Sequence, residues 1–222
     1  KIVGSPYSRE DVAATAQFHL ERVVREFVSY WVKKTGIKEV QLSGGVFANV
    51  KLNQKIANIK TIKSLIVHPG MSDCGISLGA ALYVNAKKPK INQKNYYLGP
   101  HKSKDIDEMM LKYRIKAYKP KNISQIVATK LAEKKIVARY SSSSEYGPRA
   151  LGNRSILFHA GDPKVNKFLN KKLSRTEFMP FAPVTIIDDI EKSYVIPKNT
   201  DIFESMKYMT ITVNCTKYMK KY

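Results

Sequence analysis

The chain has 222 residues, with 39 Lys and Arg against 18 Asp and Glu, so its formal net charge is +21. A hydrophobic content of 43% beside 26% charged residues is typical of globular proteins and excludes a largely disordered chain. No apolar run approaches the ~20 residues of a membrane-spanning helix, and two cysteines are too few for a disulfide framework. We therefore expect a cytoplasmic protein with no membrane partner.

The positive charge does not by itself identify a partner. Basic chains bind nucleic acid, anionic lipid or phosphorylated small molecules, but here the lysines are spread along the sequence and form no dense tail. This distribution favours a solvated surface, so a nucleic-acid partner is not expected. The first residue is Lys1, with no initiator Met and no signal-peptide pattern, which suggests a piece of a longer protein.

The first part of the chain alternates helices and strands. A long amphipathic helix is predicted over residues 8–33, where Ser8 and Asp11 resemble a capping box. Its apolar residues recur at three- and four-residue steps, which predicts a core-facing stripe. Strands at 39–42 and 64–68 and helices at 46–60 and 73–86 follow, an order that indicates an α/β fold. The expected stripe consists of Val12, Ala16, Leu20, Val23, Val24, Phe27 and Trp31.

A change of composition follows these elements. Residues 87–103 contain two prolines and few aliphatic residues, so we place a linker at 91–103 between domains at 1–90 and 104–222. The second domain is predicted to be a separate α+β unit. Its expected helices span 105–113, 124–133 and 165–173, and its expected strands span 135–140, 155–159, 184–187 and 209–213.

Two turns of the first domain are candidate ligand sites. Gly44 and Gly45 separate a strand from a helix, where backbone N–H groups can approach an anionic or polar ligand, although such a turn is more often a tight connection. Asn49 and Asn53 lie four residues apart and would share a helix face that could contact a ribose or a base. Asp73 begins the next helix, where its carboxylate could cap that helix or bind a metal or ribose.

The strongest candidate lies in the second domain. The segment 141–157 combines a run of four serines, a Gly-Pro turn, Arg149 and Arg154, which together are predicted to form a cup for phosphate or carboxylate. Ser142 and Ser144 would supply further donors, and Arg175 in the following aromatic segment could add another cation. A surface loop with scattered arginines is the alternative interpretation.

Together these segments resemble the carbamoyltransferase family of nodulation and antibiotic-tailoring enzymes. The similarity runs through DVAATAQFHLE, LSGGVFANVKLNQKI, HPGMSDCGISLGAAL, SEYGPRALGNRSILFHAGDP and SRTEFMPFAPVTI and covers nearly the whole chain. It implies the second half of an actin-like domain of the ribonuclease H-like type, followed by a YrdC-like α/β domain. The smaller domain would form carbamoyl adenylate from ATP and carbamoyl phosphate. The carbamoyl group would then pass to a hydroxyl of a small molecule or glycan.

The resemblance also implies site residues and cofactors. Arg149, Arg154 and Arg175, with Ser142 and Ser144, would bind carbamoyl phosphate and nucleotide. Gly44, Gly45 and Asn49 match the nucleotide-contacting turn of the first domain, and Asp73 matches an acidic ligand of an iron-type metal. Magnesium would accompany ATP. The family's metal-binding histidines and its last segment are expected to lie outside this sequence, and an exposed apolar face left by the missing half could promote a homodimer.

Two alternatives stay open. A tRNA-modifying threonylcarbamoyl-type enzyme would share the fold ancestry and would explain the +21 charge. A non-catalytic module that binds anions or nucleic acid is the second alternative, because many family members carry arginines where this chain has Ser143 and Met179.

Overall fold

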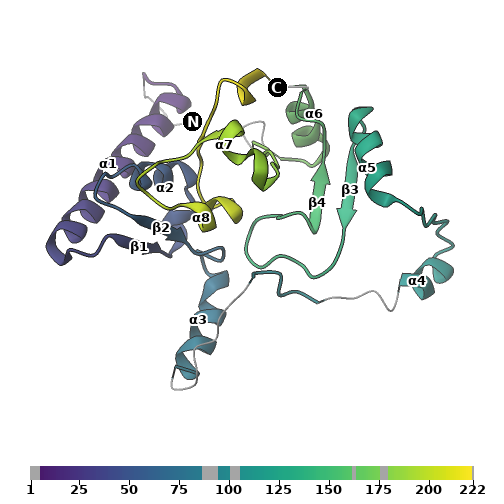
Figure 1. Cartoon of the computed structure of the whole chain (residues 1–222), viewed down its shortest axis with the longest axis horizontal. Coiled ribbons are helices and arrows are strands. Elements are labelled where there is room, and N and C mark those ends of the chain that lie inside the picture. The colour runs from purple at the N-terminus through teal and green to yellow at the C-terminus, as the bar shows by residue number, and fades with distance from the viewer. Residues whose placement is uncertain (1–5, 87–94, 101–105, 162–163, 176–179, 222) are drawn as a thin grey trace. The chain divides into compact units, whose positions relative to one another are not determined.

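The computed structural model contains both helices and strands, in agreement with the predicted α/β class (Figure 1). The chain forms two compact units that do not follow the sequence order strictly. The first consists of Lys1–Lys90 with Tyr194–Thr216, and the second of Ile91–Ser193 with Lys217–Tyr222. Among the described residues, no helix is both long and apolar enough to span a membrane. The described residues are 6–86, 95–100, 106–161, 164–175 and 180–221.

The first unit is built around two parallel strands that pair in register from Glu39 with Ser64 to Leu42 with Val67. A continuous apolar cluster surrounds them and includes the fully buried Leu65. Its elements are α1 (Arg9–Thr35), β1 (Glu39–Leu42), the 3-10 helix η1 (Gly45–Ala48), α2 (Val50–Ala57), β2 (Ser64–Val67), α3 (Cys74–Val84), β5 (Tyr194–Val195), α8 (Phe203–Lys207) and β6 (Asn214–Cys215).

Helix α1 begins as predicted but packs over a narrower face than its sequence suggests. Ser8 caps it in a reciprocal capping box with Asp11. Val28 and Val32 are buried, whereas Phe27 of the expected stripe is 63% exposed. The reason is the direction of the packed face: Leu20, Val24, Val28 and Val32 follow one another at four-residue steps against the core, and Phe27 lies about 100° around the helix from Val28.

The predicted helix over 46–60 is interrupted. Residues Gly45–Ala48 form a 3-10 turn, and α2 begins only at Val50. The interruption occurs at Asn49, because its side-chain oxygen accepts a hydrogen bond from the Leu52 N–H and so starts a new helix.

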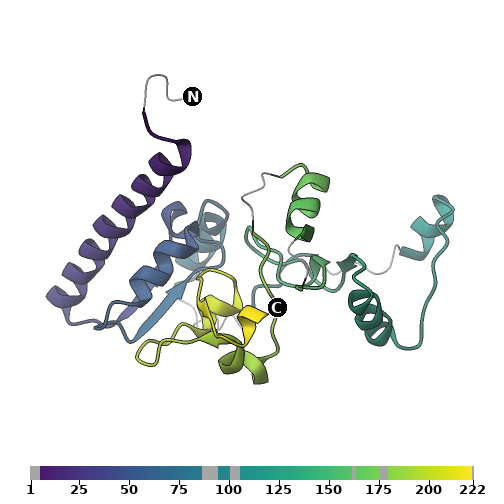
Figure 2. The same ribbon diagram turned by 90° about the horizontal axis from the view of Figure 1, so that it is seen from above.

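Residues 194–216, which the sequence analysis places in the second domain, pack in the first unit. The Asp201 carbonyl accepts from the Leu65 N–H, and the Ser205 hydroxyl accepts from the Val67 N–H and donates to the Leu65 carbonyl. Because Val67 and Leu65 belong to an edge strand, these bonds satisfy backbone groups that would otherwise be buried unpaired. Figure 2 shows this segment and α1 on either side of α2 and β2.

The strand predicted over 209–213 is therefore wrong. Its residues do not pair in a ladder; instead the Thr210 hydroxyl donates to the Val67 and Ser205 carbonyls. Only the two-residue strand β6 follows, paired antiparallel with β5.

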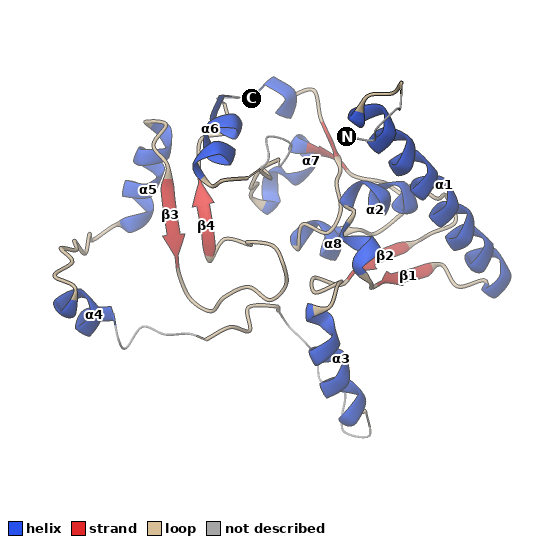
Figure 3. Cartoon of the chain, turned by 180° about the vertical axis from the view of Figure 1, so that it is seen from behind, coloured by secondary structure: helices blue, strands red, loops and turns tan. Residues whose placement is uncertain are grey.

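In the second unit, β3 and β4 form an antiparallel pair in which Val137 pairs with Leu157 and Tyr140 with Arg154 (Figure 3). The three predicted helices and the first two predicted strands of this unit are present, whereas 184–187 is not a strand: a 3-10 turn starts at Ile187 and leads into the short helix α7 (Ile190–Ser193), which was not predicted. The elements are α4 (Ile106–Lys112), α5 (Ile123–Ala132), β3 (Val137–Tyr140), β4 (Arg154–Leu157), α6 (Lys164–Lys172), η2 (Ile187–Asp189), α7 (Ile190–Ser193) and η3 (Met219–Lys221).

Candidate functional site

The two candidate turns of the first unit meet at one edge of its sheet. They follow β1 and β2, and the Gly44 N–H donates to the Met71 carbonyl at 2.5 Å. Gly44 has φ +120°, a conformation that side-chain-bearing residues rarely adopt, so glycine is required there. Because ligands of parallel sheets bind beyond the carboxyl ends of the strands, Gly44, Gly45 and Asp73 are well placed for such a role.

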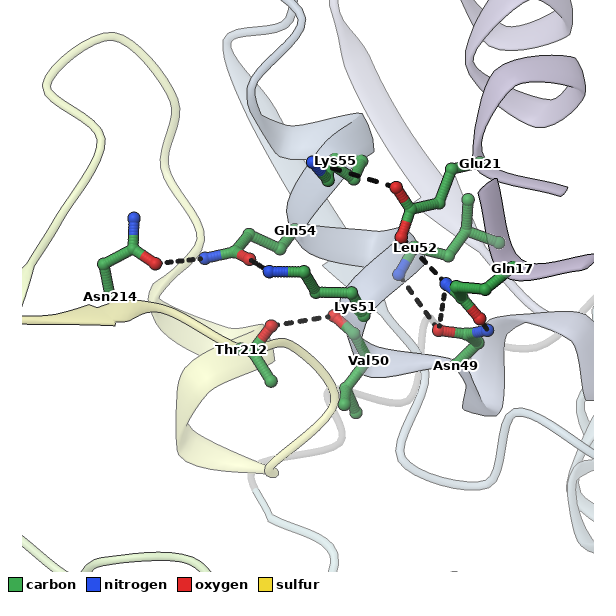
Figure 4. Close-up of polar contacts among 10 residues, drawn as sticks. All are labelled: Gln17, Glu21, Asn49, Val50, Lys51, Leu52, Gln54, Lys55, Thr212 and Asn214. Atoms are coloured by element: carbon green, nitrogen blue, oxygen red, sulfur yellow. Dashed lines mark hydrogen bonds and ion pairs between the residues drawn. The ribbon is translucent and has the colours of Figure 1, made fainter. Parts of the chain in front are cut away.

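Asn49 makes structural hydrogen bonds in addition to its cap. Its side-chain nitrogen donates to the Gln17 side-chain oxygen at 2.7 Å, which joins α1 to the start of α2 (Figure 4). Asn53 is fully buried and donates to the Phe47 and Thr210 carbonyls. The amide of Asn53 therefore faces the core and cannot contact a nucleotide, whereas the nucleotide contact expected of Asn49 stays a prediction.

Asp73 is exposed, and its carboxylate makes no hydrogen bond to the N-terminus of α3. Asp73 therefore does not cap α3, which was the structural role that the sequence offered as an alternative to ligand binding. Within the described ranges, no three or more His, Cys, Asp and Glu side chains come together as metal ligands. Asp73 could give a metal one ligand, so the described residues do not form a metal site and we derive no reaction step from a metal.

The loop of residues 141–154 in the second unit forms a hydrogen-bonded cup. Arg154 donates from Nη1 to the Ser141 carbonyl at 2.5 Å and the Asn153 carbonyl at 3.1 Å, and from Nη2 to the Ser142 carbonyl at 3.0 Å. Its guanidinium also stacks 3.5 Å from the ring centroid of Tyr140. A guanidinium has five N–H groups: three bind loop carbonyls, and the other two make no hydrogen bond to the residues that the structure describes.

Arg149 lies at the tip of the same loop and is half-buried. Burial lowers the pKa of its guanidinium, which nevertheless keeps its charge at neutral pH. Ser142 contributes its carbonyl to Arg154 and has φ +45°, and the Ser144 carbonyl accepts from the Gly99 N–H. The loop therefore contains four of the five residues predicted to bind carbamoyl phosphate.

Arg175, the fifth residue, follows α6. Its N–H donates to the Asn170 carbonyl at 2.7 Å, and its guanidinium lies 5.3 Å from the ring centroid of Phe181. Within the described part of the chain, it makes no hydrogen bond or ion pair with the 141–154 loop. The neighbouring Met179 lies outside the described residues.

Sequence reasoning missed Glu145. One oxygen of its carboxylate, Oε1, accepts hydrogen bonds from the N–H groups of Leu151, Asn153 and Arg154 at 2.9, 2.6 and 3.0 Å. Glu145 is the only acidic residue of segment 141–154. A single acidic residue in a loop proposed to bind anions was the only feature of the sequence that could have pointed to a structural role for Glu145.

Sequence reasoning also did not predict that residues 96–99, which precede the helices of the second unit, form hydrogen bonds with the loop. The Tyr96 carbonyl accepts from the Tyr146 N–H at 2.7 Å, and the Tyr97 hydroxyl donates to the Leu151 carbonyl at 3.0 Å. Residues expected to form a linker thus support the cup, together with the bond from Gly99 to Ser144.

Comparison with known proteins identifies two matching family descriptions. Carbamoyltransferase N-terminus matches residues 2–82, and carbamoyltransferase C-terminus matches residues 128–222. The second match includes 194–216, the segment that packs in the first unit.

Individual relatives agree. An uncharacterized protein of Methanocaldococcus jannaschii is 35% identical over 196 residues, 84% of this chain and 37% of the relative. Nodulation protein NolNO of Sinorhizobium fredii is 29% identical over 223 residues, 93% of this chain and 32% of the relative. Nodulation protein NolO of Bradyrhizobium diazoefficiens is 28% identical over 217 residues, 93% of this chain and 40% of the relative. The chain thus spans between 32% and 40% of these relatives, and it belongs to the carbamoyltransferase family.

Proposed function

We propose that this chain is part of an ATP-dependent O-carbamoyltransferase. It would form carbamoyl adenylate from carbamoyl phosphate and ATP, release pyrophosphate, and transfer the carbamoyl group to a hydroxyl of a small molecule or glycan. The observation that supports this best is the hydrogen-bonded 141–154 loop, which contains Arg149 and in which Arg154 donates to the carbonyls of Ser141, Ser142 and Asn153. Family membership supports the carbamoyl donor.

The chemistry of adenylation fits these residues. Negative charge builds on phosphate oxygens as pyrophosphate leaves, and fixed cations stabilise that charge without having to reorganise. Arginine suits this role because its planar fork matches two phosphate oxygens at once. Arg149 and Arg154 would bind the anionic part of carbamoyl phosphate and the nucleotide.

In this proposal, the first unit has an actin-like fold and the second a YrdC-like fold. Gly44 and Gly45 would contact nucleotide at the edge of the first sheet, close to the exposed Asp73. Asp73 would be one ligand of a divalent metal, as the family resemblance implies.

The direct test is pyrophosphate release from ATP by the purified chain, with and without carbamoyl phosphate. Release that requires both compounds would establish adenylation. If neither ATP nor carbamoyl phosphate binds to the folded chain by isothermal titration calorimetry, the adenylation proposal is wrong.

Arginine variants test the site. Arg149→Ala should weaken carbamoyl phosphate binding by ~1.5–3 kcal/mol, the value of a charged hydrogen bond left unmade. The control is Arg139→Ala, which removes a cation from the exposed β3 at a position adjacent to Tyr140 and therefore on the opposite face of the strand. Equal affinities of the two variants would remove Arg149 from the site.

One observation favours a second candidate, an anion-binding module without transfer activity. Three of the five N–H groups of Arg154 already bind loop carbonyls, which leaves fewer donors for a transition state. Binding of carbamoyl phosphate without pyrophosphate release would support this candidate.

A further inference from the structure

One anionic side chain, that of Glu145, holds the 141–154 loop together, although this loop is proposed to bind anions. We call its three backbone hydrogen bonds the Glu145 clamp. Three backbone N–H groups converge on Glu145 Oε1, from Leu151, Asn153 and Arg154. Hydrogen bonds to an ionised acceptor are roughly twice as strong as neutral ones, so this side chain is a strong constraint on the loop. The three donors lie six to nine residues after Glu145, on the opposite arm of the loop.

Other bonds join the same two arms. The Asn153 side-chain nitrogen donates to the Ser143 carbonyl at 2.9 Å, and Arg154 donates to the carbonyls of Ser141 and Ser142. The segment between Glu145 and Leu151 is therefore a short tip tied at both ends. Arg149 lies within this tip, so its freedom is limited by the clamp.

We propose that Glu145 is a positioning residue that ties the two arms of the 141–154 loop and thereby holds Arg149 and Arg154 for an anionic substrate. The consequence for substrate rests on the proposed function, whereas the tying of the arms does not. Ordering the arginines before binding reduces the entropy that a ligand would otherwise lose on association.

Two physical effects of removing Glu145 have opposite signs. If its charge acted only through space, its loss would strengthen anion binding, because a negative charge near the cup would disappear. If Glu145 positions the arginines, its loss would weaken anion binding, because the arms would separate. The direction of the change therefore distinguishes positioning from simple electrostatics.

The experiment compares Glu145→Ala with Glu145→Gln in the full chain. It combines calorimetric titration with carbamoyl phosphate and amide hydrogen exchange at Leu151, Asn153 and Arg154. Glu145→Ala should accelerate exchange at these amides by about tenfold or more and weaken carbamoyl phosphate binding by about tenfold. Glu145→Gln should fall between wild type and Glu145→Ala, because its neutral carbonyl can still accept the three bonds.

Glu133→Gln is the matched control. Glu133 is an exposed glutamate of the same unit that pairs with Lys130 at 3.0 Å, so this variant removes a similar charge without touching the loop. It should leave exchange in the loop and binding unchanged. Protection of β3 and β4 in each variant shows that the unit is still folded.

The outcomes separate the two hypotheses. Unchanged exchange, or tighter binding, in Glu145→Ala would overturn the positioning role. If wild type fails to bind carbamoyl phosphate, the proposed function is wrong, and the exchange data alone then decide whether Glu145 ties the arms. If Glu145→Ala loses protection throughout β3 and β4, the decision passes to Glu145→Gln, for which faster exchange at the three amides without weaker binding would contradict the proposal.

Discussion

The first compact unit buries a continuous apolar cluster, whereas the second is ordered mainly by polar contacts. In the first, α1, α2, β2 and residues 194–216 all contribute side chains to one core. Among the described residues of the second, only Leu169, Asn170 and Ser193 are buried. The difference indicates that the first unit depends on packing and that the candidate cup depends on hydrogen bonds near solvent.

This difference matters for function, because the cup contains most of the residues proposed to bind substrate. The stability of an apolar core changes little with pH and salt, since its free energy comes from removing apolar surface from water. A charged side chain that binds backbone groups at a solvated surface responds to its own protonation. The two units should therefore fail under different conditions.

The largest expected effect is a cavity in the first core. Ile202→Ala removes a side chain that is only 2% exposed and should lower the free energy of unfolding by about 2–5 kcal/mol. Urea unfolding followed by the fluorescence of Trp31, the single tryptophan, reports this unit. Val195→Ala, at a 55% exposed position of the same segment, is the control. A cost below 1 kcal/mol for Ile202→Ala would show that residues 194–216 do not belong to the core.

A smaller effect is expected from the buried polar contact at the edge of β2. Ser205→Ala leaves the Val67 N–H and the Leu65 carbonyl without their side-chain partner, which should cost about 1–3 kcal/mol. The same urea experiment measures this cost. Ser77→Ala, on the exposed surface of α3, should change stability little; equal costs for the two variants would contradict a special role for Ser205.

In the second unit, Gly99→Ala should loosen the cup without affecting the first core. A Cβ at Gly99 would lie 2.5 Å from the Ser144 Cβ, and relief of that clash should cost about 1–3 kcal/mol locally. Faster amide exchange at Tyr146, whose N–H bonds to Tyr96, is the measurement. Gly79→Ala has open space and should be neutral or stabilising. If Tyr146 exchange is unchanged in Gly99→Ala, residues 96–99 do not support the loop.

The smallest effect is a local response to acid. Burial raises the pKa of Glu145, but backbone hydrogen bonds, those of Leu151, Arg154 and Asn153 among them, outweigh it, so the pKa lies below its ordinary 4.5. The clamp is thus fully formed above pH 4.5 and is lost as the pH falls through the lower folded value. Amide chemical shifts of Leu151 and Asn153 should titrate together below pH 4.5 and should not do so in Glu145→Gln. A midpoint above 4.5 would contradict the proposed bonding.

Local chemistry made much of this fold predictable. Patterns within a few residues predicted the Ser8 cap and the long first helix with its recurring apolar residues. Such patterns also predicted the strands at 39–42 and 64–67 and the loop with Arg149 and Arg154. The capping box is an example, because both of its partners lie within one helical turn.

The errors occur where partners are distant along the chain. The sequence could not show that residues 194–216 pack against β2, because the short apolar run at 209–213 is compatible with a strand in its own domain. It could not show that Phe27 would be exposed, since that depends on which face of α1 packs against the rest of the first unit.

The same distinction applies to the candidate site. The types and spacing of Arg149 and Arg154 indicated an anion cup from the sequence alone, because charge and glycine content are properties of the residues themselves. Only the tertiary structure decided that Arg154 binds three loop carbonyls, that Asn53 faces the core and that Glu145 joins the two arms. A hydrogen bond depends on where two groups lie in space, and for these residues the folded loop and core determine those positions.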